Sequence, residues 1–248
     1  MSQLGIKQQR MLKKLLRRPD IWRGESRRFA RRQCLKTGYA ELDKSLVQQG
    51  WPLAGLIEIT QNNLGAGEWQ LLAPGLRNLK QTPGYIVLIN PPEMPYAPGL
   101  KFLGLDLNEI MIINPKSRED AVASVIEALR ASACKALLCW ENQMRFKPQE
   151  LRKLQLAVSL SQSFCLLFRH SNALRQNSPA VLRLHIEMEA QQIQIQLLKQ
   201  RGALQHKEVH LDLPEAWSPL PPLHSNEWLE IDKNVFTGAQ ILPFRQRT

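Results

Sequence analysis

The chain has 248 residues, of which 44% are apolar, enough to bury the core of one domain with arms or of two small domains. No apolar run approaches the roughly 20 residues that cross a bilayer, and the basic N-terminus lacks the apolar stretch of a secretory signal, so we expect a cytoplasmic protein with no membrane contact. The four cysteines (Cys34, Cys134, Cys139, Cys165) have neither CxxC nor Cys/His ligand spacing, so free thiols are expected.

The positive charge is concentrated at one end of the chain. Residues 1–36 contain twelve Lys or Arg against two acidic residues, whereas the other 212 residues contain 21 basic against 20 acidic residues. Such an arm suits a polyanion such as DNA, because each neutralised phosphate releases counterions. An acidic protein surface, or no specific partner, remain alternatives. The candidate contacts for DNA or a partner in this arm are Lys13, Lys14, Arg17, Arg18, Trp22, Arg23, Arg27, Arg28, Phe29, Arg31 and Arg32.

The first elements in chain order are helical. Apolar residues recur at helical spacing between basic ones over residues 4–16, and Pro19 ends the run, which predicts an amphipathic basic helix. Trp22 and Phe29 follow it, either as anchors for a partner or as packing residues. The stretch "TGYAELDKSL" predicts a short helix that is capped by Thr37 and has Leu42 and Leu46 on one face.

Apolar runs then alternate with helical segments. Strands are expected at 56–60, 85–90, 110–113, 136–140 and 164–168, and helices at 68–80, 96–103, 117–132 and 148–163. Strands that are apolar throughout and separated by helices indicate a mainly parallel sheet covered on both faces.

The C-terminal part has a different pattern. The stretch "AVLRLHIEMEAQQIQIQLLKQ" alternates apolar and polar residues on both sides of Glu189-Ala190, which predicts an antiparallel hairpin at one edge of the sheet. The expected organisation is a basic arm (1–36), a core (37–210) and a Pro-rich irregular tail (211–248) with isolated aromatic anchors. "HKEVH" contains a His pair at i and i+4, which we interpret as a solvated edge strand and not a metal site.

Several segments resemble a known family. "TGYAELDKSLVQQGWPLAGLIEI" is similar to the entry of the RecA core, where a TG-x-x-x-LD helix precedes a G-x-P-x-G turn and the first strand. Over about 180 residues the chain resembles the ImuA family of RecA-like proteins. The motifs that carry this resemblance are "WRG" (22–24), "GWPLAGLIEI" (50–59), "GAGEWQLLAPGL" (65–76), "PPEMPYAPGL" (91–100), "LRKLQLA" (151–157), "LLFR" (166–169), "SPAVLRL" (178–184) and "LLKQRG" (197–202).

The resemblance implies a fold and a setting. The fold is α/β and RecA-like, with a mainly parallel central sheet flanked by helices, a C-terminal antiparallel hairpin and an N-terminal basic helical arm. The setting is the SOS response to DNA damage, with an ImuB-like inactive Y-family polymerase, RecA and an error-prone replicative polymerase as partners. The cell-division inhibitor SulA is a distant relative, so binding of FtsZ is an alternative function.

The loop "QNNLGAGEWQ" stands where such a fold would hold a nucleotide. A P-loop uses backbone N–H groups, a Lys for the β and γ phosphates, and a Ser or Thr for Mg²⁺. Here Gly65 and Gly67 remain, but Glu68 occupies the Lys position and Trp69 the hydroxyl position. Reversing a charge about 4 Å from a phosphate costs several kcal/mol, about 4 per unit charge at an effective dielectric near 20. We therefore expect a vestigial loop, no cofactor and no ATPase activity, with residual nucleotide binding as the less favoured alternative.

The other nucleotide-site positions agree with this interpretation. The catalytic carboxylate position falls on Pro92, beside Glu93, and the Walker B position falls on Trp140, beside Glu141. Glu93 and Glu141 alone are weak evidence for a metal, so no metal and no catalytic residue is expected. "LFRHSNALRQNSPA" occupies the place of a RecA DNA-binding loop, so Arg169, His170 and Arg175 are candidate phosphate contacts, the alternative being an ordinary surface loop.

Overall fold

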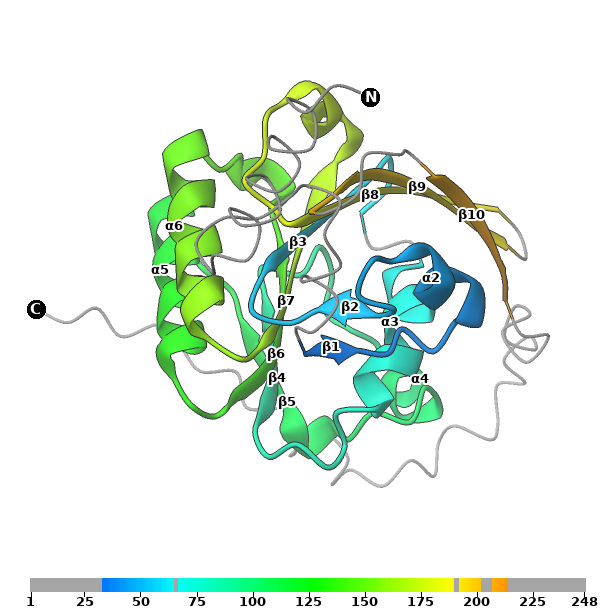
Figure 1. Cartoon of the computed structure of the whole chain (residues 1–248). Helices are drawn as coiled ribbons and strands as arrows, with labels where there is room; N and C mark the ends of the chain where they lie inside the picture. Colours follow the sequence, from blue (N-terminus) through cyan, green and yellow to red (C-terminus); the bar gives the residue numbers. More distant parts are fainter. Residues whose placement is uncertain (1–32, 65–66, 190–191, 202–206, 214–248) are drawn as a thin grey trace, which may run out of the picture.

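The computed structural model describes residues 33–64, 67–189, 192–201 and 207–213 (Figure 1). Its centre is an eight-stranded sheet in the order β10-β9-β8-β3-β7-β6-β4-β5. The strands are β3 (Leu56–Gln61), β4 (Tyr85–Ile89), β5 (Ile110–Ile113), β6 (Cys134–Trp140), β7 (Phe164–His170), β8 (Leu182–Met188), β9 (Gln192–Gln200) and β10 (Lys207–Asp212). A separate two-stranded sheet pairs β1 (Cys34–Leu35) with β2 (Trp51–Pro52).

Six neighbouring strands run parallel, which in their order across the sheet are β8, β3, β7, β6, β4 and β5. The middle strand β3 pairs with β7 on one side and with β8 on the other, so that Ile57 faces Leu166 and Leu182. The strands β8, β9 and β10 are antiparallel to one another. The expected parallel sheet with an antiparallel hairpin is therefore confirmed, and the predicted strands differ from the observed ones only at their ends.

Helices cover both faces of the parallel part. The helices are α2 (Ala40–Ser45), α3 (Glu68–Arg77), α4 (Ala97–Phe102), α5 (Arg118–Arg130) and α6 (Pro148–Leu160), with 3-10 turns at Leu107–Glu109, Asn142–Met144 and Ser171–Arg175. Figure 1 shows α5 and α6 on one face, and α2, α3 and α4 on the other beneath the curved β8–β10 extension. Because both faces are buried, each central strand alternates between two hydrophobic cores, with Ile57 and Ile59 in one and Leu56 in the other.

The entry to the core differs from the prediction in two respects. Helix α2 begins at Ala40 with Tyr39 as its N-cap residue, so Thr37 is not the helix cap. Thr37 instead makes a local turn, in which its Oγ1 accepts a hydrogen bond from the Tyr39 N–H over 3.0 Å. Leu35 is buried in the core and its strand pairs with β2, so the core begins before residue 37.

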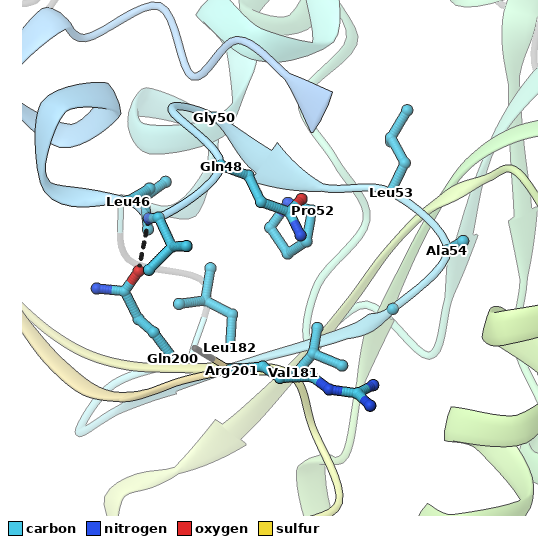
Figure 2. A pocket seen from close by; sticks show the side chains of 12 residues that line it. Leu46, Gln48, Gly50, Pro52, Leu53, Ala54, Val181, Leu182, Gln200 and Arg201 are labelled. Carbon is cyan, nitrogen blue, oxygen red and sulfur yellow. Dashed lines mark hydrogen bonds between the residues drawn. The ribbon is translucent and has the colours of Figure 1, made fainter. Parts of the chain in front are cut away.

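A small pocket lies at the amino end of β3, where this entry segment meets the hairpin (Figure 2). It encloses about 30 Å³. The Gln200 side chain closes one wall, because its Oε1 accepts from the Val47 N–H over 3.0 Å and its Nε2 donates to the Ser45 carbonyl over 3.1 Å. These two hydrogen bonds beside the pocket hold the end of α2 against β9.

Two predicted segments lie largely outside the described residues. These are the arm up to residue 32, with its helix and its candidate contacts, and the tail from residue 214. Among the residues that the structure does describe, no helix has the length and apolar character that a membrane span requires.

Candidate functional site

The loop between β3 and α3 begins the candidate site. Gly67 has φ of 87°, a left-handed conformation that strains any residue with a Cβ, and it forms the N-cap of α3. A Cβ at Gly67 would also lie 2.4 Å from Sδ of Met188 on β8. Glycine is therefore required here by the backbone conformation, and any larger residue would also have to displace the flexible Met188 side chain. Gly65 lies outside the described residues.

Glu68, which the sequence motif predicts at the position of a P-loop Lys, turns its side chain into the protein. Only 1% of Glu68 is exposed. Its Oε1 accepts a hydrogen bond from Gln61 Nε2 over 2.5 Å and one from the indole Nε1 of Trp140 over 3.3 Å. The carboxylate is thus held by β3 and β6 and is not presented to solvent.

Trp140, which the resemblance predicts at the Walker B position, fills the space beside Glu68. Its ring stacks on Phe168 with centroids 4.9 Å apart and an interplanar angle of 20°. Trp69, in the hydroxyl position of the loop, packs against Trp140 at 6.4 Å. Aromatic pairs of this kind add about 0.5–1.5 kcal/mol beyond the burial of their area. Glu68, Trp69 and Trp140, which the motifs predict at the phosphate and Mg²⁺ positions of a P-loop, therefore pack together around Trp140.

A cleft of about 1210 Å³ opens beyond these residues, at the carboxyl ends of β3, β4, β6 and β7. This is the end of a parallel sheet at which α/β proteins bind ligands. Amide side chains are common in its lining, namely those of Asn62, Asn63, Asn90, Asn142, Gln143, Asn172 and Gln176. Pro92 also lines the cleft, whereas the side chain of Glu93 is exposed.

The cleft wall has an unusual backbone. Asn90, Asn142 and Arg145 all have positive φ, at 55°, 43° and 31°. Side-chain hydrogen bonds support two of these residues, because Asn90 Nδ2 donates to the Trp140 carbonyl over 2.9 Å and Asn142 Nδ2 donates to the Asn90 carbonyl over 2.8 Å. Such conformations cost about 1–3 kcal/mol each and cluster at functional sites.

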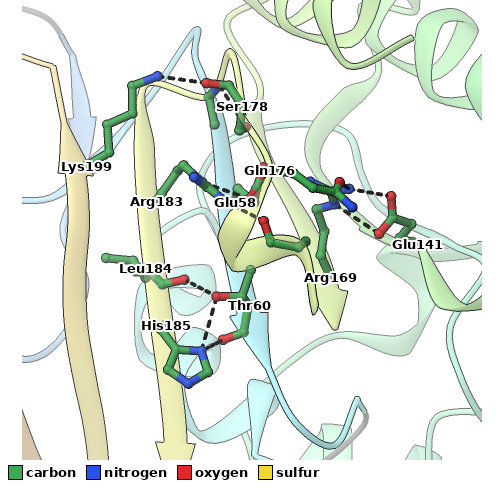
Figure 3. Close-up of polar contacts among 12 residues, drawn as sticks. Glu58, Thr60, Glu141, Arg169, Gln176, Ser178, Arg183, Leu184, His185 and Lys199 are labelled. Carbon is green, nitrogen blue, oxygen red and sulfur yellow. Dashed lines mark hydrogen bonds and ion pairs between the residues drawn. The ribbon is translucent and has the colours of Figure 1, made fainter. Parts of the chain in front are cut away.

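The floor of the cleft is a buried ion pair between Arg169 and Glu141 (Figure 3). Arg169 Nε donates to Glu141 Oε2 over 2.9 Å, and Arg169 Nη2 donates to Glu141 Oε1 over 2.8 Å. The same Nη2 donates to Gln176 Oε1 over 2.9 Å, and Glu141 Oε1 also accepts the Phe146 N–H over 2.7 Å. Both oxygens of Glu141 are therefore engaged within the protein.

The position of Arg169 corrects the sequence interpretation. Arg169 is 1% exposed and its guanidinium is already bound by carboxylates, so it is a structural residue and not a surface contact for phosphate. The neighbouring candidates His170 and Arg175 are exposed. His170 Nδ1 accepts from the Asn172 N–H over 3.2 Å, which orders the turn after β7.

The ion pair continues across the sheet as a buried network that sequence reasoning missed. Glu58 on β3 is fully buried, and its Oε1 accepts from Arg183 Nε on β8 over 2.9 Å. Its Oε2 lies 3.5 Å from Arg169 Nη1. Figure 3 shows these charged side chains in a row above Thr60 and His185. The signal that could have revealed the network is Glu58 itself, a lone charge within an apolar strand.

The structure also describes the acidic, His and Cys side chains that could bind a metal or act as thiols. Among the described residues, no group of three or more His, Cys, Asp or Glu side chains could hold a metal ion. His210 is exposed on the edge strand β10, as predicted, whereas His206 lies outside the described residues. All four cysteines are free, as expected. Burial raises the pKa of Cys134 to about 11 and also raises the pKa of Cys139 and of Cys165, so these thiols stay protonated at neutral pH.

Comparison with known proteins adds no further resemblance. Neither the models of protein families nor the curated proteins include a match to this chain. The resemblance to the ImuA family therefore depends on the sequence motifs alone.

Proposed function

We propose that this chain is a non-catalytic, RecA-like accessory protein of the SOS response. In this proposal it helps to assemble an error-prone translesion polymerase complex, together with an ImuB-like inactive Y-family polymerase, on DNA or on RecA filaments. The proposal combines the resemblance of the motifs, the basic arm and the arrangement of side chains around Glu68. The central sheet, with six parallel strands and an antiparallel extension, is compatible with the RecA-like fold that the motifs imply.

The observation that carries the proposal is the contact between Glu68 and Trp140. Glu68 replaces the positive charge that a triphosphate needs, and the hydrogen bond from Trp140 Nε1 holds it in the interior. A nucleotide bound in the usual way would have to displace Trp69 and Trp140 from their packing and would meet a negative charge. A scaffold of this kind supports recruitment of partners and not hydrolysis.

Nucleotide binding tests the first half of the proposal. Isothermal titration calorimetry with ATP and Mg²⁺ should give no saturable heat with the full chain. Because two unit charges interact by several kcal/mol at close range, we expect a dissociation constant at least about a hundredfold weaker than the micromolar range. Micromolar binding accompanied by phosphate release would overturn the non-catalytic assignment.

The arm tests the second half. The quadruple variant R27A/R28A/R31A/R32A keeps Gln33 and β1 in place while removing four positive charges. We expect it to weaken binding of the full chain to single-stranded DNA or to the ImuB-like partner. For DNA, log K should fall with log salt by about 0.7 for each phosphate contact, and the slope should be smaller in the variant. Unchanged, salt-insensitive binding of both ligands would contradict the role given to the arm. Filamentation of cells on overexpression, without DNA damage, would favour the SulA-like alternative.

A further inference from the structure

The outer face of α6 carries two leucines that the core does not use. Leu151, Leu154 and Val158 are the buried residues of this helix. Leu156 and Leu160 lie on the opposite side and are 62% and 82% exposed. Because they are four residues apart, their side chains are neighbours on the helix surface. Single exposed leucines are common on proteins, but an adjacent pair on one helix face forms a small apolar patch.

Positive charges accompany the two leucines. Arg152 and Lys153 are exposed one turn earlier on the same face, and Arg145 and Lys147 are exposed just before the helix begins. Within the described part of the chain, Arg145, Arg152 and Lys153 make no ion pair. The nearby carboxylate of Glu150 is already bound by Arg118 Nε over 3.2 Å and by the Lys147 N–H over 2.6 Å. The face therefore combines apolar contact area with uncompensated positive charge.

A hollow extends this surface at the N-terminal end of α6. It encloses about 680 Å³ between the helix and the loop at 176–179. Arg145, Lys147 and Arg152 line it together with the polar Gln176, Asn177 and Ser178, and none of its lining residues is acidic. At a rise of about 1.5 Å per residue, the distance along α6 from Arg152 to Leu160 is about 12 Å. A short segment can therefore contact the hollow and the leucines at once.

We propose that the outer face of α6 is a docking site for an acidic amphipathic segment of a protein partner. Two apolar side chains of that segment would cover Leu156 and Leu160, and its carboxylates would face Arg152, Lys153 and the hollow. Helix-in-groove recognition uses such anchors at i and i+4, and charge complementarity sets the register. This surface is independent of the proposed function, because it follows from α6 alone and holds for a partner in any pathway.

The observations favour an acidic protein segment over two other anionic ligands, a nucleic acid and a membrane surface. A nucleic acid would neutralise the cations but would leave Leu156 and Leu160 uncovered. A membrane would need a broader apolar face, and α6 cannot rotate to provide one because Leu151, Leu154 and Val158 anchor it in the core. The partner segment is therefore defined by its chemistry: two leucine-sized side chains with acidic residues toward one end.

The test uses a panel of fluorescein-labelled 14-residue helical peptides. Each peptide carries a Leu pair at i and i+4 and a cluster of Glu, and the spacing between pair and cluster changes by one residue through the panel. A second panel has Lys in place of Glu. Binding to the full chain is followed by fluorescence anisotropy at about 50 mM and about 300 mM NaCl, a range over which screening separates ionic from apolar contributions.

Three variants give the diagnostic comparison. L156S/L160S should weaken the best acidic peptide by about tenfold or more, since it removes most of the apolar contact area. R152E/K153E should weaken that peptide at low salt and should bind the Lys peptide, which the unmodified chain should not bind. The control K101E/F102S changes an exposed Lys and a 63% exposed Phe on α4, on the other side of the sheet, and should bind as the unmodified chain does.

Three results would overturn the proposal. The first is that no acidic peptide binds the unmodified chain more tightly than it binds L156S/L160S. The second is loss of dT30 binding in R152E/K153E with no effect of L156S/L160S on any ligand, which would assign the face to nucleic acid. The third is loss of sedimentation with phosphatidylserine vesicles in L156S/L160S while the peptides do not bind, which would assign it to a membrane surface.

Discussion

Replacing Arg169 by Met removes the cation from the floor of the cleft and should destabilise the fold strongly. The change deletes two hydrogen bonds to Glu141, of 2.9 and 2.8 Å, and one of 2.9 Å to Gln176, while Met retains much of the apolar stem. Glu141, which is 5% exposed, is then left without its cation. Breaking a buried pair in this way costs about 3–5 kcal/mol. At about 2–4 °C per kcal/mol for a chain of this size, the melting temperature should fall by about 6–20 °C.

The assay is urea unfolding followed by circular dichroism, with Arg175→Met as the matched control. Arg175 is exposed on the 3-10 turn that follows β7, so its loss should change the free energy of unfolding by less than about 0.5 kcal/mol. The double variant E141Q/R169M should recover part of the loss, because Gln leaves no buried charge at position 141, while Glu58 keeps its pairing with Arg183. If R169M unfolds within about 1 kcal/mol of the unmodified chain, or if R175M costs as much, the description of Arg169 as a buried structural residue is incorrect.

Further variants at Glu68, Gly67 and Cys134 test the site and its surroundings. Glu68→Gln keeps an oxygen that can accept from Trp140 and should lower the free energy of unfolding in urea by about 1 kcal/mol. Glu68→Lys removes both acceptor oxygens and should lower it by about 3 kcal/mol or more. Equal effects of the two variants would contradict the inward position of Glu68. Gly67→Ala should lower the stability by about 1–3 kcal/mol, and G67A/M188A should recover only the part due to contact with Met188, so full recovery would show that the backbone is not strained. Burial raises the pKa of Cys134 to about 11, so the unfolded chain loses this thiol proton first, and the free energy of unfolding should fall as the pH rises from about 9 to 11. Cys134→Ser should remove about 2 kcal/mol of the difference in unfolding free energy between pH 8 and pH 10.5. An unchanged dependence of that free energy on pH would contradict the burial of the thiol.

The sheet could be predicted because burial on both faces leaves a direct mark in the sequence. Strands β3, β6 and β7 are almost fully buried, so they read as apolar runs, and the hairpin reads as alternation because only one of its faces is buried. The ends of the helices leave a weaker mark in the sequence. Thr37 has the side chain of a typical cap, but its hydroxyl bonds to the Tyr39 N–H two residues later, which is a turn that competes with the cap.

The polar interior could not be predicted, since its partners are distant in sequence. Glu58 and Arg183 are 125 residues apart, and Glu68 and Trp140 are 72 residues apart. The sequence shows that Glu68 has the wrong charge for a P-loop, but not that its carboxylate turns inward. Likewise, Arg169 follows the apolar run 164–168 in the sequence, as a loop residue would. In the structure it belongs to β7, and Glu141, which follows the neighbouring strand β6, pairs with it.

The central position of β3 also affects how the chain folds as it is made. β3 is synthesised before any other strand of the large sheet, yet both of its neighbours, β7 and β8, come much later, and the contact between Thr60 and the Leu184 carbonyl spans 124 residues. Until those strands leave the ribosome, the apolar β3 segment has two open edges. Such non-local pairing slows folding and lengthens the time for which aggregation-prone intermediates are exposed. We therefore expect the nascent chain to need protection by chaperones until β8 has been made, and the finished protein to refold slowly from denaturant.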